Sequence, residues 1–399
     1  MIKNSLTLIV AVYNLGNKLV PCLKSLQSIT SRQIKIIIID DGSDIETKKI
    51  LYDFQKLLPT CEIKTQENSG IVSVRKLGLL LCNTEFIAFM DGDDFVEPGY
   101  YEQLLSIAIS HRPDVVIGAY TEWDDSGVIS VESNKVMPGL YADEYWNREK
   151  CKMLFSSEDF YTPRFFTFLW NKIFRTEFVA PFVLEVPIKI RMGEDAAVTI
   201  PALYMARSVF VSEASGYFYV QHNASMMKKN VDGIEELENI RLLWSHFLTY
   251  NRYLEKYLVH FEYDIRQYLA SLFYVRAFMN FANTSHIFWP FFLQDCDSKL
   301  AIVGKGNYFE CLRSYAHFLP TSRQAVIFSE FNGANLDLIL LTLKDNDRII
   351  LANINPFARR KIKGILIANN VSSSIIVEPN FELVKDAMET LEAEILLSR

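Results

Sequence analysis

The sequence predicts an α/β protein with a mostly parallel sheet, followed by a helical segment and a smaller α/β unit. Between residue 6 and about residue 120, short β-branched runs alternate with stretches of helical period, as they do in β-α-β units. The runs are apolar on both faces, as strands covered by helices on both sides should be. With 399 residues, half of them hydrophobic, the chain can form one large or two ordinary domains.

The first 120 residues supply five strands and four helices. Strands are expected at LTLIVAV, IKIIIID, EIKTQE, EFIAFMD and DVVIGAY, which begin at residues 6, 34, 62, 85 and 114. Helices are expected over 19–26, 45–58, 72–81 and 100–109. This order predicts a sheet whose strands are joined by crossover helices.

Three further segments follow. The first segment completes a first domain at 1–230. It contains a hairpin-like stretch (EWDDSGVISVESNKVMPG), an aromatic stretch (FYTPRFFTFLWNKIF), a helix (GEDAAVTIPALYMA) and two short strands around a turn (SVFVSEASGYFYVQH). Residues 231–296 are rich in Leu, Tyr and Phe, which predicts a helical segment. Over 297–399 the alternation returns in KLAIVGKGNYF, AVIFSEF, DRIILANI, GILIANN and SSIIVEP, before a closing helix to Leu397. We expect a small Rossmann-like α/β domain there.

Composition and charge narrow the functional class. A net charge of -7 and a pI near 5.5 argue against a general nucleic-acid binder, which needs a basic face for phosphates. Six cysteines are scattered without C-x-x-C spacing, which favours free thiols in a reducing cytoplasm. No stretch reaches the roughly 18 apolar residues of a membrane-spanning helix, and the N-terminal apolar run fits a first strand better than a leader. We expect a soluble or peripheral protein.

Acidic side chains follow two of the expected strands. IIIIDDGS ends on Asp40, Asp41 and Ser43, and FIAFMDGDD ends on Asp91, Asp93 and Asp94. Ligands of open α/β sheets bind outside the carboxyl ends of the strands, and residues i and i+2 of an extended segment point the same way. Asp91 and Asp93 can therefore converge, with Gly92 allowing close approach.

Convergent carboxylates in a cleft need a cation or a proton. Mg2+ or Mn2+ held by one or two carboxylates keeps positions open for substrate phosphates, so the pattern predicts a phosphorylated ligand. Each motif alone has a structural alternative, a turn at DGDD or a helix cap by Ser43 or Asp44. Their pairing at two strand ends favours a site.

These motifs resemble the family-2 glycosyltransferases of the GT-A fold, which transfer a sugar from a nucleotide diphosphate with inversion at the anomeric carbon. The resemblance covers about residues 5–228. It rests on VAVYN, IIIIDDGS, QENSGIVSVRKLGL, FIAFMDGDDFVEPGY, LWNKIF, GEDAAV and YVQHNAS, in the order and spacing of that family. It implies a UDP-sugar donor, a glycan or lipid-linked acceptor and a role in bacterial surface glycan synthesis.

The resemblance also implies roles for individual residues. Ala11 and Tyr13 would line the pocket of the nucleotide base, Asp41 would bind that base, and Arg75 would close over it. Asp91 and Asp93 would hold ribose and metal, with Asp94 beside them. Asp195 would be the catalytic base, and His222 and Ser225 would lie near the diphosphate. Inverting displacement needs one base and no covalent nucleophile, and a metal can meet the charge of the leaving diphosphate. Helix position should keep Asp195 ionised.

Several assignments have alternatives. Asp195 could be a simple helix N-terminal acid, in which case Glu194 or His222 becomes the candidate base. Trp170 of LWNKIF could stack on an acceptor sugar or fill the core, and Lys172 of the same motif is a donor, acceptor or diphosphate candidate. The family commonly has an Arg where this chain has Val220, and Lys228 and Lys229 could replace that charge.

The remaining expectations concern partners and rival functions. AIVGKGNYF and Glu330 suggest a dinucleotide site in the last domain, yet Phe309 replaces the third Gly, and packing is the stronger explanation. HIFWPFFL (286–293) could be a membrane-interface anchor or packing, and a homo-oligomer is compatible with the sequence. A nucleotidyltransferase would need a Gly-rich basic loop after the first strand, which YNLGNKL lacks. A non-catalytic nucleotide-sugar or scaffold protein is the other alternative.

Overall fold

The computed structural model describes residues 5–29, 31–124, 126–152, 154, 163–221, 233–276, 300–304, 325–328, 333–342, 347–352 and 356–377. By their contacts the residues fall into two compact units. The first comprises Met1–Leu154, Pro163–Lys228 and Arg241–Glu262; the second comprises Phe155–Thr162, Lys229–Ile240 and Tyr263–Arg399. The candidate site residues that the structure describes all belong to the first unit.

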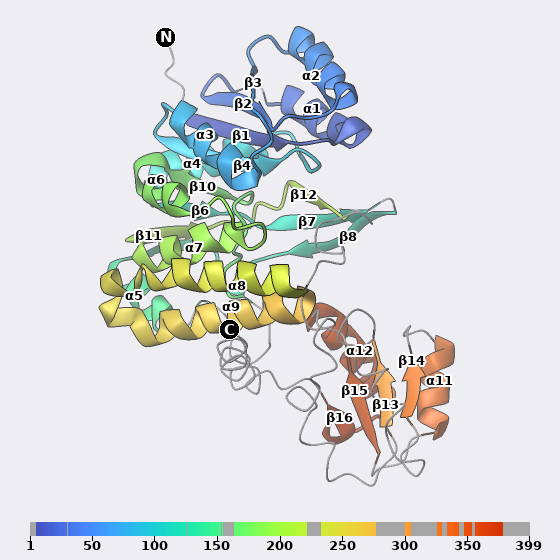
Figure 1. Ribbon diagram of the computed structural model, residues 1–399. Helices are drawn as coiled ribbons and strands as arrows, with labels where there is room; N and C mark the ends of the chain where they lie inside the picture. The colour runs from blue at the N-terminus through green and yellow to red at the C-terminus, as the bar shows by residue number, and fades with distance from the viewer. Residues whose placement is uncertain are drawn as a thin grey trace. The chain divides into compact units, whose positions relative to one another are not determined.

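An eight-stranded sheet forms the centre of the first unit, in the order β3-β2-β1-β4-β10-β6-β11-β9 (Figure 1). The strands are β1 (Leu6–Val12), β2 (Ile34–Asp40), β3 (Glu62–Thr65), β4 (Phe86–Asp91), β6 (Val115–Ile117), β9 (Gly139–Ala142), β10 (Lys172–Arg175) and β11 (Ser208–Val211). Strands β1 to β4 are mutually parallel, as are β6 and β11. Strand β10 runs antiparallel between β4 and β6, and β9 runs antiparallel to β11. The mostly parallel α/β sheet confirms the predicted fold class.

The sheet core comes directly from the β-branched runs. In β1 and β2 almost every side chain is buried, with Leu8, Val10 and Ile38 fully inaccessible. Burial on both faces needs helices on both sides, which are α1 (Leu19–Gln27), α2 (Ile45–Leu57), α3 (Ile71–Leu81), α4 (Tyr100–His111), α5 (Asp143–Lys150), α6 (Thr176–Glu185) and α7 (Glu194–Met205). The helices expected in the first 120 residues are all present, with ends shifted by no more than two residues.

Helix α3 packs unusually close to β1. A Cβ on Gly78 would lie 2.5 Å from Ile9 Cγ2, a separation that Cβ atoms do not tolerate. The glycine therefore lets the helix backbone sit against the strand. Helix α2 begins at Asp44, whose carboxylate accepts a hydrogen bond from the Thr47 amide at 2.8 Å, so Asp44 is a helix cap.

A second, four-stranded sheet has the order β5-β12-β7-β8. Its strands are β5 (Phe95–Val96), β7 (Tyr120–Asp124), β8 (Gly127–Glu132) and β12 (Tyr217–Val220). The hairpin predicted from the sequence is confirmed by antiparallel β7 and β8. The two strands expected around the turn near residue 213 exist as β11 and β12, but they belong to different sheets. Crossing between the sheets brings β12 beside β5, which directly follows the DGDD motif.

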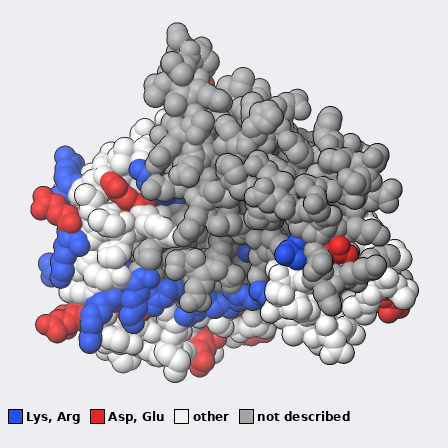
Figure 2. Space-filling model, turned by 90° about the horizontal axis from the view of Figure 1, so that it is seen from below, with Lys and Arg blue, Asp and Glu red and all other residues white. Residues whose placement is uncertain are grey.

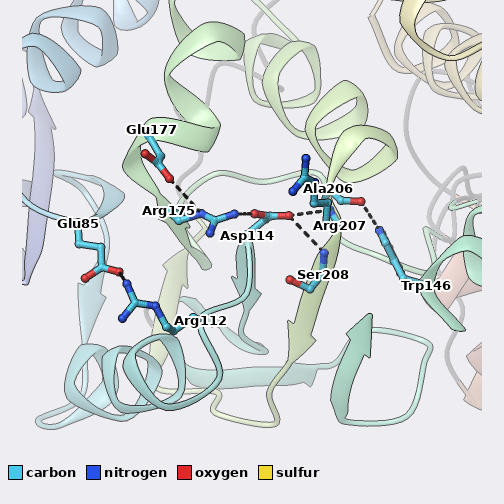
Figure 3. Close-up of polar contacts among 9 residues, drawn as sticks. All are labelled: Glu85, Arg112, Asp114, Trp146, Arg175, Glu177, Ala206, Arg207 and Ser208. Carbon is cyan, nitrogen blue, oxygen red and sulfur yellow. Dashed lines mark hydrogen bonds and ion pairs between the residues drawn. The ribbon is translucent and has the colours of Figure 1, made fainter. Parts of the chain in front are cut away.

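A buried carboxylate joins three strands at the opposite end of the central sheet (Figure 3). Asp114 is 1% exposed, pairs with the Arg175 guanidinium, and accepts hydrogen bonds from the backbone amides of Arg207 (2.6 Å) and Ser208 (3.3 Å). Since these groups belong to the ends of β6, β10 and β11, the carboxylate fixes the register of strands that are far apart in sequence. Arg112 and Glu85 form an exposed pair nearby.

Two longer helices follow the first 221 residues, α8 (Gly233–Leu248) and α9 (Leu258–Arg276). Within the first unit, His246 contacts the Ala197 carbonyl oxygen at 3.1 Å, and the Tyr257 hydroxyl donates to Asn147 Oδ1 at 2.7 Å. Short 3-10 turns occur at Gly16–Lys18, Asn251–Tyr253, Glu255–Tyr257 and Ser373–Ile375. Domain boundaries near residues 230 and 296 stay a proposal.

The second unit contains a parallel sheet in the order β14-β13-β15-β16. Its elements are β13 (Leu300–Val303), β14 (Ala325–Phe328), α11 (Gly333–Thr342), β15 (Arg348–Leu351), α12 (Pro356–Ala368) and β16 (Ile376–Val377). GILIANN was wrongly grouped with the strand-like runs, because GILIA is the last part of α12 and continues its helical period. The closing helix, the 286–293 stretch, Phe309 and Glu330 lie outside the described residues.

The described surface carries charges of both signs. Figure 2 shows Lys and Arg side chains as well as Asp and Glu side chains on the face seen from below, so the net charge of -7 is not spread as a uniformly acidic surface. In the parts of the chain that the structure describes, no helix is both long and apolar enough to cross a membrane.

Candidate active site

The strand register brings the predicted site residues to one edge of the sheet. Ala11 pairs with Asp91 across β1 and β4, and Val12 pairs with Asp40 across β1 and β2. The carboxyl ends of three parallel strands therefore lie at the same level (Figure 1). The strand pairings thus place the ends of β2 and β4, after which the two acidic motifs follow, at the same edge of the sheet.

Asp41 lies just beyond β2 and is 3% exposed. Its Oδ1 accepts hydrogen bonds from Gln66 Nε2 (2.6 Å) and the Ser69 amide (3.0 Å), and its Oδ2 accepts one from the Gly70 amide (2.8 Å). The carboxylate thus anchors the loop that leads into α3, at the helix end where partial positive charge favours an anion. Sequence reasoning did not give Gln66 a role, although its motif was part of the resemblance.

The loop after β1 is tied to the loop after β2. The Asn14 amide donates to Ser43 Oγ (3.0 Å), and the Asp44 amide donates to Asn14 Oδ1 (2.7 Å). Asn14 has a positive φ of 50°. Tyr13, beside it, is 47% exposed, so its ring is available to stack on a planar ligand.

Asp91 and Asp93 face solvent at the end of β4. The Asp91 side chain keeps 35% of its accessible surface, so a ligand can reach it. Burial among protein atoms nevertheless raises the pKa of Asp91 to about 7; Arg75 opposes this rise, and Asp195 and other nearby carboxylates add to it. Within the described residues, the Asp93 carboxylate makes neither a hydrogen bond nor an ion pair.

Gly92, between these two acids, has a packing role. Its amide donates to the Ala11 carbonyl oxygen at 2.9 Å, and an added Cβ would lie 2.6 Å from that oxygen. The sequence suggested that Gly92 leaves space for a ligand. The space is instead occupied by β1, which draws the motif against the sheet.

Asp94, in contrast to Asp91, is only 1% exposed. It accepts hydrogen bonds from the Tyr217 hydroxyl (2.7 Å) and the Val220 amide (2.8 Å). Burial raises the pKa of Asp94 well above its ordinary value, with Asp93 and Asp91 adding to the rise. Asp94 therefore joins the DGDD motif to β12, and the sequence contained no signal for Tyr217 as its partner.

Arg75 connects both halves of the site. It projects from α3, its side chain is 7% exposed, and its Nη1 lies 2.6 Å from Asp195 Oδ1 and 3.2 Å from Glu194 Oε1. Its Nη2 lies 3.9 Å from Asp91 Oδ1. Burial lowers the pKa of the guanidinium, but the carboxylates outweigh it and hold the pKa above the ordinary value. Within the described part of the chain, no hydrogen bond or ion pair joins Arg75 to Asp41 or Tyr13.

Glu194 and Asp195 form the first turn of α7, where the helix dipole favours negative charge. Asp195 Oδ2 accepts a hydrogen bond from the Leu169 amide at 3.1 Å. Burial raises the pKa of Glu194, against the effect of Arg75. Asp195 thus has one oxygen toward Arg75 and the other toward the backbone, and 18% of its side chain stays exposed.

Trp170 and Lys172 are both buried. Trp170, 3% exposed, stacks on Tyr217 and Phe168 with ring centroids 4.5 and 4.7 Å away, which favours the core-packing alternative. The Lys172 ammonium is inaccessible and donates to the Phe168 carbonyl oxygen and to Asn171 Oδ1. Burial lowers the pKa of Lys172 well below its ordinary value, and Asp195 opposes the change. His222, Ser225, Lys228 and Lys229 lie outside the described residues.

Asp91 and Asp93 could hold a divalent cation if a bound ligand, such as a substrate phosphate, supplied further oxygen atoms. Among the described residues, no group of three or more His, Cys, Asp or Glu side chains could hold a metal ion. Mg2+ and Mn2+ are commonly held by one or two carboxylates together with substrate phosphates. Asp91 and Asp93 supply such a pair, and Arg75 alone cannot balance the charge of Asp91, Glu194 and Asp195.

An α/β sheet that gathers these groups at its carboxyl edge defines a GT-A glycosyltransferase domain. The profile described as Glycosyl transferase family 2 matches residues 7–178. EpsH of Bacillus subtilis (strain 168), which is named as a glycosyltransferase, is 31% identical over 260 residues, 63% of this chain and 72% of EpsH. The chain belongs to glycosyltransferase family 2.

Two other similarities extend the comparison. The poly(ribitol-phosphate) β-N-acetylglucosaminyltransferase TarP of Staphylococcus aureus (strain N315) is 31% identical over 119 residues, 29% of this chain and 36% of TarP. The crystal structure of residues 1–349 of S. aureus TarS with UDP-GlcNAc has a TM-score of 0.54 at 17% identity, covering 79% of this chain and 82% of that chain. At that identity the structural similarity establishes the fold alone.

Proposed function

We propose that this protein is an inverting glycosyltransferase that moves a sugar from a UDP-sugar to a glycan or lipid-linked acceptor in bacterial surface polysaccharide synthesis. The observation that carries the proposal is that Arg75 lies beside Asp91 at the end of β4 and also pairs with Glu194 and Asp195 at the start of α7. In the proposal, Asp91 and Asp93 serve the donor and Asp195 serves the acceptor.

The donor would lie along the carboxyl ends of β1, β2 and β4. Tyr13 is exposed and can stack on the base, whereas both oxygens of the buried Asp41 carboxylate are bonded to Gln66, Ser69 and Gly70, so Asp41 would shape the base pocket through that loop. Asp91 and Asp93 would hold Mn2+ or Mg2+ together with the donor diphosphate. Such an ion neutralises charge on a departing diphosphate.

Asp195 would act as the base. In the transfer, the acceptor oxygen forms a bond to the anomeric carbon as the bond from that carbon to the diphosphate oxygen breaks, and UDP leaves. The acceptor hydroxyl proton passes to the Asp195 carboxylate, which lies in the first turn of α7 beside Arg75. Because attack and departure occur on opposite faces, the anomeric configuration inverts.

Several narrower features belong to the same proposal. A hexose or N-acetylhexosamine donor is supported by the named activity of TarP and by UDP-GlcNAc in the TarS crystal. A cytoplasmic location on the inner face of the plasma membrane would give access to lipid-linked acceptors, and the unpaired Cys22, Cys61, Cys82 and Cys151 suit a reducing compartment.

The metal part of the proposal is tested by UDP binding. Titration calorimetry of UDP with Mn2+, with EDTA, and with Asp93→Ala should show binding that is strong only with both metal and carboxylate. Asp53→Asn, which changes an exposed carboxylate paired with Lys56, is the control and should bind UDP normally. Undiminished UDP affinity in EDTA would contradict the metal bridge.

The catalytic part is tested by donor turnover. With a panel of UDP-sugars and Mn2+, Asp195→Asn should lose about two to four orders of magnitude in hydrolysis or transfer, with UDP affinity within a few-fold of wild type. A merely capping acid would tolerate Asn. Wild-type protein that binds UDP yet turns over no donor would instead support the non-catalytic alternative.

A further inference from the structure

We propose that Arg75 is a positioning residue: it holds the carboxylate of Asp195, the proposed base, in a fixed position relative to Asp91 of the DGDD motif. The inference rests on the proposed function and deepens it. It differs from the role implied by the family resemblance, in which Arg75 closes over the nucleotide base.

The contacts of Arg75 support this role. Nη1 lies between Asp195 (2.6 Å) and Glu194 (3.2 Å), residues 119 and 120 positions further along the chain, while Nη2 faces Asp91 at 3.9 Å. One guanidinium therefore connects the start of α7 with the end of β4. A shift of α7 or of β4 would therefore move Asp195 or Asp91 relative to the Arg75 guanidinium.

Asp195 is fixed from two sides. Oδ1 faces Arg75, and Oδ2 accepts the Leu169 amide at 3.1 Å. The hydrogen bond at Oδ2 and the ion pair at Oδ1, which does not have hydrogen-bond geometry, restrict the carboxylate from two sides. Because a base must lie within hydrogen-bond reach of the acceptor hydroxyl, this plane determines whether proton transfer is productive.

The geometry specifies arginine rather than lysine. A guanidinium has two outward nitrogens in a rigid fork, so it can face Asp91 with one and the Glu194–Asp195 pair with the other. A lysine ammonium is a single point charge at the end of a flexible stem. Arg75 is itself held in place by close packing of α3, since Gly78 lies one turn later against Ile9.

Three variants at this position make the test. Arg75→Gln, Arg75→Lys and the double variant Arg75→Gln with Asp195→Asn are compared by donor turnover, UDP calorimetry and thermal unfolding. Arg112→Gln, at an exposed Arg–Glu pair, is the matched control and should behave as wild type. Arg75→Lys retains a cation among the carboxylates and keeps the test valid if Arg75→Gln does not fold.

We expect Arg75→Gln to lower kcat by about 100-fold, the scale of a misplacement of about 1 Å, while UDP affinity changes less than about 5-fold. Arg75→Lys should recover part of the loss. In the Asp195→Asn background, Arg75→Gln should lower turnover by less than about 3-fold more, because residues that act as a unit are not additive.

Four results would overturn the inference. Weaker UDP binding with unchanged kcat would move Arg75 to the nucleotide, and fully additive losses would separate it from Asp195. Wild-type protein that hydrolyses no UDP-sugar would refute the proposed function and this inference with it. Normal wild-type turnover combined with an unimpaired Arg75→Gln variant would refute the role of Arg75 alone.

Discussion

Replacing Gly78 by Ala should lower both stability and turnover. The added Cβ would meet Ile9 Cγ2 at 2.5 Å, Cγ1 at 2.9 Å and Cδ1 at 3.1 Å. Ile9 is 1% exposed and β-branched, so its side chain has few rotamers into which it can move. Helix α3 must therefore shift away from β1, and Arg75 shifts with it.

The magnitude follows from two opposed effects. Overpacking a filled core costs about 1–3 kcal/mol, and Ala recovers about 1 kcal/mol as a better helix former. A contact at 2.5 Å belongs to the upper part of the first range, so we expect a net loss of about 1–2 kcal/mol. At roughly 2–4 °C per kcal/mol, Tm should fall by about 2–8 °C, and displacement of Arg75 should lower kcat by about 10-fold or more.

Calorimetry and donor turnover measure these effects. Gly364→Ala on α12 is the matched control, because nothing lies within 4 Å of its added Cβ, and helix propensity alone predicts a neutral or stabilising change. In an Ile9→Ala background, Gly78→Ala should cost less than in wild type, because the clashing atoms are gone. Wild-type stability and turnover in Gly78→Ala would refute the close packing of α3.

Three other predictions concern buried charge. Asp114→Asn should lower the free energy of unfolding, measured with denaturant, by about 2–4 kcal/mol, because the Asn amide must place a donor against Arg175 or against the Arg207 and Ser208 amides. The exposed Glu85→Gln should change it by no more than about 0.5 kcal/mol. Equal losses in the two variants would contradict the greater contribution of the buried carboxylate. Burial and Lys256 lower the pKa of Lys150 from 10.5 to about 8, so between pH 8 and 10.5 the unfolded chain binds this proton and the folded chain does not. Stability of wild type relative to Lys150→Met should rise across that range, and a pH-independent difference in Tm would argue against the shift. Asp94→Ala should cost about 2–4 kcal/mol by leaving the Tyr217 hydroxyl and Val220 amide unpaired, whereas Tyr217→Phe should cost less; a neutral Asp94→Ala would show that water replaces the carboxylate.

The mostly parallel sheet and the edge on which the acidic motifs lie could be predicted from the pattern of residues along the chain. Periods of apolar residues specify strands and helices locally, and strands buried on both faces imply crossover helices. Because parallel strands end at a common edge, the acids after β2 and β4 could be brought together before any contact was known, and the pairing of Ala11 with Asp91 agrees.

Which of the acids are exposed depends on the packing of distant elements. Asp93 and Asp94 are adjacent and chemically identical, yet Asp94 is buried by Tyr217 and Val220, more than 120 residues away. The pattern along the chain contains no information about such a partner, because side-chain burial depends on which elements pack together. The division of β11 and β12 between two sheets, which delivers Tyr217, is equally non-local.

The partners of Arg75 illustrate the same limit. Its helix was predicted from local period, but the guanidinium reaches Asp195 because Gly78 lets α3 approach β1 and because α7 begins at that edge. The GILIA stretch is a similar case: it is part of α12, but a short apolar run fits a buried strand and a buried helix face equally well, so the sequence alone could not distinguish them. Local sequence sets the elements and their polar ends; the approach of those elements sets the distances and burial on which the chemistry depends.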